Sequence, residues 1–331
     1  MNQQLSFDLM FTILHVVSAK TAGKPKTDKL DQFSYHYRNH DFESQSKLKM
    51  QSLIIRKPPN YYRVSEGDFY TGDYYKVDKR IDSVEYAPDV FAHLRELDNI
   101  STNELKNKLG PDVAENIARI KKAGEGMGKS GSFFFSCYDD SLLIKTMPED
   151  DFTAFMKLLP HYFEHVNTYR KSLLARIYGI YQVKLEGMNP VFLILMGSVK
   201  QIGDQYVKRV YDLKGSTVKR EVFHVNDEGK KEADGEDYFK ATDILKDLNL
   251  KKLMEKEIIL KFDKADQNAI LAEMFRSVTL LNMHNLMDYS LLFCVSYNPK
   301  YVSLHPEKFH RVNGRYVLKT EHVEHNLKEA Q

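Results

Sequence analysis

The stretch GEGMGKSGSFFFSCYDDSLLIKT (residues 124–146) decides how the rest of the chain is interpreted. Its glycines allow backbone N–H groups to approach an anion closely, and nests of this kind bind phosphate in several unrelated folds. The aromatic run after the glycines predicts a strand, and Asp139 and Asp140 predict a turn into a second strand that carries Lys145. We therefore expect a phosphate-binding loop that leads into a strand pair rather than into a helix.

Two other phosphate-binding loops fit the flanking residues less well. A Walker loop would need a glycine where the chain has Ala123, and a helix directly after Ser130. The dinucleotide-binding fingerprint matches the glycine spacing, but it follows a strand and opens a helix, whereas residues 112–122 are predicted to be helical. A kinase-type loop, in which a hairpin covers nucleotide phosphates and a neighbouring strand offers a lysine, accounts for this order. On its own, however, the glycine motif also fits an ordinary turn.

The composition is that of an ordinary globular protein. Of its 331 residues 42% are hydrophobic, so the chain can bury a substantial core as one large domain or as two lobes. The 48 Lys and Arg residues nearly balance 46 Asp and Glu residues, and a net charge of +2 gives no global field that favours nucleic acid. Cys137 and Cys294 lie in apolar runs, which indicates reduced thiols in a cytosolic protein.

We expect the main domain to begin near residue 61. The polar, lysine-rich stretch before it closes with RKPP (residues 56–59), so residues 1–60 are predicted to be an N-terminal extension or linker. Within it, the apolar residues 5–17 are too short to span a bilayer and lack the features of a signal peptide. They favour an amphipathic helix, with the end of a membrane segment from a larger parent protein as the alternative.

The remaining patterns predict a strand-rich first part and a mixed second part. The expected helices are residues 101–109, 112–122, 150–163 and 266–286, and the expected later strands are residues 173–185, 191–196, 206–213 and 289–296. This order indicates an α+β protein with antiparallel sheets and two lobes, residues 61–197 and 198–331. A cleft between two lobes is a common place for a nucleotide.

Two further motifs combine charge with hydroxyl groups. DLKGST (residues 212–217), followed by Lys219 and Arg220, offers cations, hydroxyls and a glycine that permits close approach to phosphate. MDYSLL (residues 287–292) places Asp288 between a predicted helix and a predicted strand, where a carboxylate facing a cleft can accept the proton of an alcohol. Taken alone, the first is also typical of a strand-to-turn transition and the second of a helix cap. No HRDxxxxN or DFG motif is present, which argues against a protein kinase.

In their order and wording these motifs resemble the phosphatidylinositol-phosphate kinases. Members of that family carry, in this order, a GxSGSxFF loop, an IIKT-like strand, DLKGST and MDYSLL. The similar segments here are GKSGSFF (residues 128–134), LIKT (143–146) and the two hexapeptides above. The resemblance covers roughly residues 61–296, and residues 86–97 resemble the helix on the family's dimer side. It implies a two-lobed lipid-kinase fold over residues 61–331, with a nucleotide cleft between the lobes.

The resemblance implies transfer of a phosphoryl group from ATP, with Mg²⁺, to a membrane phosphatidylinositol monophosphate. Catalytic roles would fall to Asp288 and Lys145, and nucleotide binding to Gly126, Gly128, Ser130, Gly131, Ser132, Lys145 and Lys214. The substrate and lipid face would comprise Asp212, Ser216, Thr217, Lys219 and Arg220, whose cations suit an anionic membrane surface. The implied location is cytoplasmic, peripheral to the inner face of membranes or within a larger membrane protein, and a homodimer is compatible with it.

Two details limit these implications. The glycine loop and Lys219 resemble type I members, which convert phosphatidylinositol 4-phosphate to the 4,5-bisphosphate, whereas Val218 and Glu221 resemble type II. After residue 298 the chain lacks the family's Ile-Ile-Asp segment, whose aspartate holds magnesium, and its lysine-bearing activation loop. Since losing that carboxylate costs orders of magnitude in rate, we expect either a truncated kinase, which we favour, or a scaffold that binds nucleotide or anionic lipid without efficient turnover.

Overall fold

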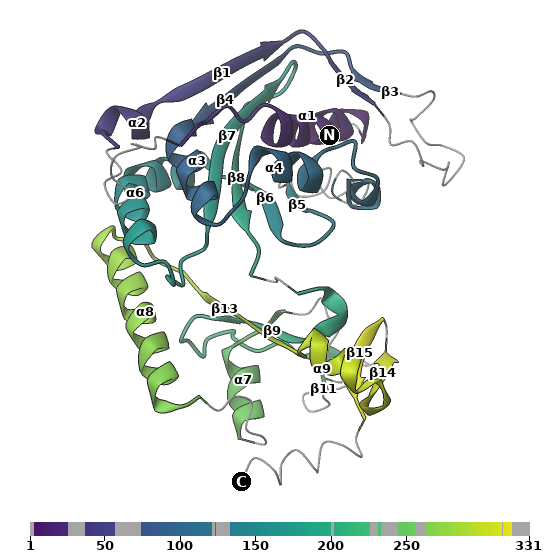
Figure 1. Cartoon of the computed structure of the whole chain (residues 1–331), viewed down its shortest axis with the longest axis vertical. Helices are drawn as coiled ribbons and strands as arrows, with labels where there is room; N and C mark the ends of the chain where they lie inside the picture. Colours follow the sequence, from purple (N-terminus) through teal and green to yellow (C-terminus); the bar gives the residue numbers. More distant parts are fainter. Residues whose placement is uncertain are drawn as a thin grey trace. The chain divides into compact units, whose positions relative to one another are not determined.

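Figure 1 presents a computed structural model of the chain. It describes residues 3–25, 37–56, 74–120, 123, 133–199, 202–225, 231–232, 244–255, 262–312 and 314–319. Two compact units divide the chain, residues 1–198 and 199–331, and each is described by itself. The chain is α+β, as the sequence predicts.

The first unit is built on a six-stranded antiparallel sheet. Its strand order is β1 (Gln45–Met50), β4 (Ile81–Tyr86), β7 (Ile177–Leu185), β8 (Val191–Gly197), β6 (Leu142–Met147) and β5 (Phe134–Ser136). The predicted hairpins β5–β6 and β7–β8 are confirmed, and both pair antiparallel. At one edge, β1 exposes Lys47 and Lys49, and lysines on an edge strand discourage pairing with another chain. β2 (Leu53–Arg56) and β3 (Tyr74–Val77) form a separate two-stranded ribbon.

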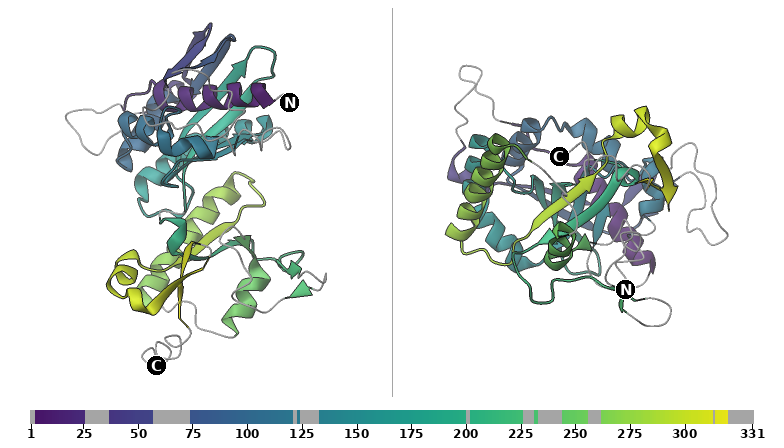
Figure 2. Two further views of the ribbon diagram at one scale, coloured as in Figure 1. Left: turned by 90° about the vertical axis from the view of Figure 1, so that its right-hand side faces the viewer. Right: turned by 90° about the horizontal axis from the view of Figure 1, so that it is seen from below.

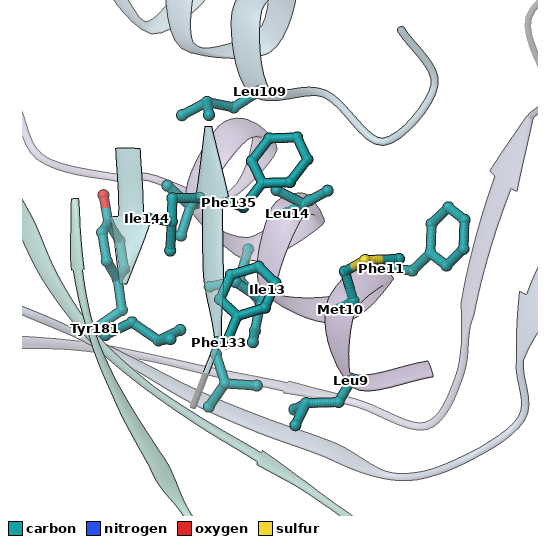
Figure 3. Packing of buried hydrophobic residues seen from close by; sticks show 14 of the residues in the cluster. Leu9, Met10, Phe11, Ile13, Leu14, Leu109, Phe133, Phe135, Ile144 and Tyr181 are labelled. Atoms are coloured by element: carbon teal, nitrogen blue, oxygen red, sulfur yellow. The ribbon is translucent and has the colours of Figure 1, made fainter. Parts of the chain in front are cut away.

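Helix α1 (Gln3–Ala19) fills the core of the first unit. Figure 3 shows Leu9, Met10, Ile13 and Leu14 of this helix packed with side chains from α4 and the sheet, and all four are buried. A helix that is apolar on nearly all sides requires burial, which explains why it does not stay outside the fold. A helix over residues 5–17 is confirmed, but it is not the amphipathic one that was expected, because residues 6–14 are all buried. Nor do α1 and β1 belong to a separate extension, since both are integral to this unit.

Polar contacts fasten the segment after α1 to the sheet. The Thr21 hydroxyl lies 2.9 Å from the Tyr181 hydroxyl, and the Ala22 N–H donates to Glu85 Oε2 at 2.7 Å. The Lys24 N–H donates to Asp89 Oδ1 at 2.9 Å. Residues up to 24 therefore follow the surface of β4 and the start of the next helix rather than forming a free linker.

The described part of the first unit also contains the helices α2 (Asn39–Glu43), α3 (Pro88–Leu97), α4 (Thr102–Leu109) and α6 (Glu149–Thr168), and residues 117–120 are helical as well. The predicted capping box of α4 is confirmed, because Ser101 Oγ accepts the Glu104 N–H and Glu104 Oε2 accepts the Ser101 N–H. In α3, Phe91, Leu94 and Arg95 are buried within the unit. These three side chains, which lie in the segment that resembles the family's dimer-side helix, are thus used in packing within the unit.

The tip of the β5–β6 hairpin is tied to α4 by a polar network. Asp139 Oδ2 lies 3.0 Å from Lys108 Nζ, and Asp139 Oδ1 accepts the Ser141 hydroxyl at 2.6 Å and the Cys137 thiol at 2.9 Å. Partial burial alone raises the pKa of Asp139, but the hydrogen bonds from Cys137, Ser141 and Lys108 outweigh it and hold that pKa well below its usual value. The hairpin is therefore anchored at its turn as well as along its strands.

The second unit contains a smaller, three-stranded sheet of order β12 (Ile244–Leu245), β9 (Val207–Leu213) and β13 (Leu291–Ser296). β13 runs antiparallel to β9, and the two lie side by side in both views of Figure 2, whereas β12 pairs parallel with β9. Two short ribbons accompany it, β10 (His224–Val225) with β11 (Lys231–Glu232) and β14 (Phe309–Val312) with β15 (Arg315–Leu318), and its helices are α7 (Asp247–Met254), α8 (Lys264–Met283) and α9 (Pro299–Leu304). The strands predicted at 206–213 and 289–296 and the helix predicted at 266–286 are confirmed.

Candidate functional site

The DLKGST motif forms the end of β9 and the loop that follows it. Gly215 has φ +68° and Lys219 has φ +56°, so the backbone turns twice through the left-handed region between them. The first turn suits glycine, whereas the second costs free energy at a lysine. The loop consequently returns toward the end of β9, where Arg220 contacts Asp212.

Asp247, the first residue of α7, holds this loop in place. Its Oδ1 accepts the N–H groups of Lys214 at 3.0 Å and Gly215 at 2.8 Å. Two successive N–H groups form a nest that could bind a phosphate. Here the Asp247 carboxylate occupies that nest. The sequence had indicated that the glycine turn could bind phosphate through its backbone, but these N–H groups are already engaged.

Arg220 is the second partner of Asp247. Its Nε lies 2.7 Å from Asp247 Oδ2, and its Nη2 donates to the Asp212 carbonyl and lies 3.4 Å from Asp212 Oδ1. Only 10% of the Arg220 side chain is exposed. The expectation that Arg220 belongs to a flat cationic lipid face is therefore corrected, because its guanidinium is paired with Asp212 and Asp247 within the fold.

Asp288 lies on the short segment between α8 and β13. Its backbone is left-handed, with φ +61°, and its side chain is 82% exposed. Asp288 Oδ1 accepts a hydrogen bond from Lys214 Nζ at 2.5 Å. That ammonium, with a smaller contribution from Arg220, holds the pKa of the Asp288 carboxyl below its usual value. The two hexapeptide motifs, far apart in the sequence, thus meet in one ion pair.

The ion pair borders a cavity of about 610 Å³ in the second unit. The cavity is lined by residues of both motifs: Lys214, Ser216, Val218, Lys219, Arg220, Leu286, Met287, Asp288 and Tyr289. Asp212 and Thr217 do not line it. Lys214 and Lys219 make the lining cationic, and Ser216 adds a hydroxyl, a combination that suits a phosphorylated ligand.

The other predicted site residues belong to the first unit. Lys145 is exposed on β6, paired with Phe134 of β5 on one side and Ile194 of β8 on the other. Gly126, Gly128, Ser130, Gly131 and Ser132 lie outside the described residues. The structure therefore joins Lys214, Ser216, Lys219, Arg220 and Asp288 at one cavity, and it describes Lys145 separately.

Sequence reasoning missed Asp247. The residue carries a weak local signal, since an acidic side chain in the first turn of a helix is common. Nothing near it in the sequence connects it to a loop about 30 residues upstream, because that contact arises only when α7 packs beside β9.

Comparison with known proteins identifies the family. A family model described as phosphatidylinositol-4-phosphate 5-kinase matches residues 118–329, well over half of the chain. The chain belongs to this kinase family. The resemblance drawn from the four motifs is thus confirmed, and all four motifs, DLKGST and MDYSLL among them, lie within the matched residues.

Several curated members of the family are similar to the chain. A probable phosphatidylinositol phosphate kinase of Dictyostelium discoideum is 30% identical over 76% of this chain and 34% of its own length. Phosphatidylinositol 4-phosphate 5-kinase 8 of Arabidopsis thaliana is 27% identical over 88% of this chain and 32% of its own. The type-1 beta enzyme of Gallus gallus is 30% identical over 82% and 48%. The chain thus spans 32% to 48% of the length of these relatives.

The described residues contain neither a cluster of three metal-binding side chains nor a membrane-spanning helix. Among the described residues, no three His, Cys, Asp or Glu side chains converge closely enough to hold a metal ion by themselves. Nor does any described helix combine the length and the apolar character needed to cross a bilayer.

Proposed function

We propose that the chain phosphorylates a phosphatidylinositol monophosphate with ATP, and that the substrate is phosphatidylinositol 4-phosphate, giving the 4,5-bisphosphate. The observation that carries this proposal is the Lys214–Asp288 ion pair at the edge of the cationic cavity. Relatives named phosphatidylinositol 4-phosphate 5-kinases support the choice of substrate.

Asp288 is suited to receive the hydroxyl that attacks ATP. Phosphoryl transfer passes through a loose transition state, so the hydroxyl needs orientation more than a strong base. Asp288 is a carboxylate at neutral pH, and the neighbouring Lys214 lowers its pKa further. It accepts a hydrogen bond from the inositol hydroxyl and takes its proton as the new P–O bond forms and the bond from the γ-phosphorus to the leaving ADP breaks. Its exposure leaves room for a headgroup to approach.

Lys214 is suited to the developing negative charge on the phosphoryl group. Its ammonium lies beside the carboxylate that orients the nucleophile, so both groups act on the same reacting atoms. Lys145 and the glycine loop are assigned to the nucleotide phosphates on the family resemblance, in keeping with the exposed position of Lys145 on β6.

The rim of the cavity is suited to a membrane surface. Val218 and Met287 are 75% and 87% exposed, and Lys219 lies between the apolar Val218 and the buried Arg220. Apolar side chains that enter the interface, together with a lysine worth about 1 kcal/mol near anionic lipid, would hold the cavity against the headgroups. This rim supports action at an anionic membrane surface, and the family resemblance implies that the surface is the cytoplasmic face.

A lipid-kinase assay tests the proposal. Vesicles containing phosphatidylinositol, or its 3-, 4- or 5-phosphate, are incubated with radiolabelled ATP and Mg²⁺, and the products are separated. Turnover of the 4-phosphate is expected to fall by roughly 1,000-fold in Asp288→Asn and about 100-fold in Lys145→Ala. Asp266→Asn and Lys184→Ala remove comparable exposed charges elsewhere and should retain activity.

Each alternative result has a defined meaning. Activity that survives Asp288→Asn would remove Asp288 from the chemistry. Preference for the 5-phosphate would replace the substrate while keeping the reaction class. Vesicle and nucleotide binding without turnover in the wild-type chain would support the scaffold instead.

A further inference from the structure

The contacts of Asp247 serve the DLKGST loop rather than its own helix. Both carboxylate oxygens are directed to residues 214–220: one to two successive N–H groups and the other to the Arg220 Nε. Only 16% of the Asp247 side chain is exposed. Although burial raises its pKa, the hydrogen bonds from Arg220, Gly215 and Lys214 outweigh it and lower the pKa of Asp247. The carboxylate is therefore ionised and fully engaged near neutral pH.

Arg220 extends this connection to the strand. It links Asp247 of α7 to the carbonyl and carboxylate of Asp212, the residue at the end of β9. The loop is thus fixed at three points: its start at Asp212, its turn at Lys214 and Gly215, and its end at Arg220. A loop fixed at these points holds the Cα of Lys214 steady, and the long lysine side chain can then reach Asp288 in one geometry.

We propose that Asp247 is a positioning residue that, together with Arg220, sets Lys214 against Asp288 for phosphoryl transfer. The proposal rests on the function proposed above, since it assigns a role within the same site. Asp247 does not line the cavity, and it acts through Lys214 and Arg220, which do. Displacement of a reacting group by about 1 Å costs on the order of 100-fold in rate, which is the size of effect expected from this residue.

Lysine footprinting tests the positioning directly, without turnover. The wild-type chain is labelled with acetic anhydride, and the labelling of Lys214 relative to exposed Lys219 is measured by mass spectrometry. Pairing with Asp288 is expected to slow Lys214 on the order of threefold relative to Lys219. In Asp247→Asn the loop loses its charged acceptor and the ratio should rise toward one, as it should in Asp288→Asn.

Asn249→Ala is the matched control. Asn249 also lies in the first turn of α7, where its Oδ1 accepts the N–H groups of Lys246 at 3.1 Å and Val222 at 3.0 Å. It contacts neither Lys214 nor Arg220 in the described hydrogen bonds. This variant therefore loosens the start of α7 while leaving the Asp247 contacts in place, and its Lys214 labelling should match wild type.

Kinetics then tests the consequence for the reaction. Asp247→Asn is expected to lower kcat on the order of 10- to 100-fold with little change in the KM for ATP, while Asn249→Ala retains kcat. Arg220→Lys keeps the charge but loses the forked contact, so it should shift both readouts in the same direction as Asp247→Asn.

The outcomes separate this proposal from the proposed function. Unchanged Lys214 labelling in Asp247→Asn overturns the positioning role, as does an equal rise in Asn249→Ala, which would indicate a merely structural helix start. If the wild-type chain shows no turnover, the proposed function fails, yet the footprint still decides whether Asp247 sets Lys214. If labelling responds but kcat does not, the role in the reaction is overturned.

Discussion

Each of the two units is stabilised internally by a different kind of interaction. In the first, one continuous apolar cluster joins α1, α4 and the sheet, and its members are almost completely buried. In the second, the buried apolar residues within the described part are few: Val207, Val210, Tyr211, Leu245, Val302 and Phe309. There α8 leaves Leu271, Phe275 and Val278 exposed, while the loop at the cavity depends on Asp247 and Arg220.

This difference predicts different sensitivities. Apolar packing responds to lost volume and little to pH or salt, whereas charged contacts respond to both. Lys145 therefore lies on a strand supported by a deep core, and Lys214 lies on a loop supported by ion pairs. The expected effects of substitutions that probe this difference range from several kcal/mol in the apolar core to a shift in the pKa of one side chain at the cavity.

The largest effect is expected at the core of the first unit. Leu14→Ala should lower the free energy of unfolding of that unit by about 2–5 kcal/mol, because Leu14 is fully buried against α4 and the sheet. Leu271→Ala, at a side chain 55% exposed on α8, should change it by less than about 0.5 kcal/mol. Hydrogen exchange of peptides from each unit along a urea series measures both. Equal losses in the two variants would contradict the contrast.

His15 is a largely buried titratable side chain on α1, in the apolar first unit, and it should make the stability of that unit depend on pH. Burial, with a contribution from Lys20 that Asp112 partly opposes, lowers the pKa of His15 from 6.5 to about 4. Between these values the unfolded chain binds a proton that the folded chain does not, so stability falls as pH falls. Discounted for partial exposure, the loss is about 1–2 kcal/mol. His15→Gln should flatten the dependence between pH 7 and pH 4, and parallel curves for both proteins would refute it.

A smaller effect is expected at the turn of the β5–β6 hairpin. The pKa of Asp139 is lowered in the fold, so its contribution is present above the unfolded value and is lost as pH falls. Discounted for solvent screening, Asp139→Asn should cost about 1 kcal/mol at pH 7, with the difference shrinking below about pH 4. Urea unfolding at several pH values measures this. Asp78→Asn, which removes an exposed pair with Lys76, is the control and should change nothing.

The smallest effect concerns the ion pair at the cavity. Lys214→Met should raise the pKa of Asp288, since the Lys214 hydrogen bond is the main cause of its lowering. A carbon-13 NMR titration of the Asp288 carboxyl measures the shift without turnover, and the acid limb of the activity profile should move to higher pH with it. Lys219→Met is the control. An unmoved titration in Lys214→Met would mean that the pair does not persist in solution.

The sequence predicted those elements whose cause is local. The β5–β6 hairpin follows from an aromatic run and two aspartates at its turn, and α4 begins where Ser101 and Glu104 cap each other. Asp288 was correctly expected between a helix and a strand. In each case neighbouring residues contain the whole physical reason.

What the sequence did not predict depends on contacts between distant residues. The polar stretch after α1 suggested a linker, although the apolar helix itself needed the sheet for burial. Arg220 was expected on a cationic face toward anionic lipid, because the family resemblance and its charge suit a membrane surface, yet it is largely buried and paired with Asp212 and Asp247. Asp247 could be found only once α7 was seen beside β9, since its partners lie about 30 residues away.

The position of α1 also bears on how the protein is cut for expression. The family match begins at residue 118, within the first unit, so a fragment trimmed to residues 118–329 would lose α1, β1, β4 and α4. β7 would then become an open edge, with unpaired N–H and C=O groups beside the apolar face that α1 had covered. Such a fragment is expected to aggregate even though it retains all four motifs.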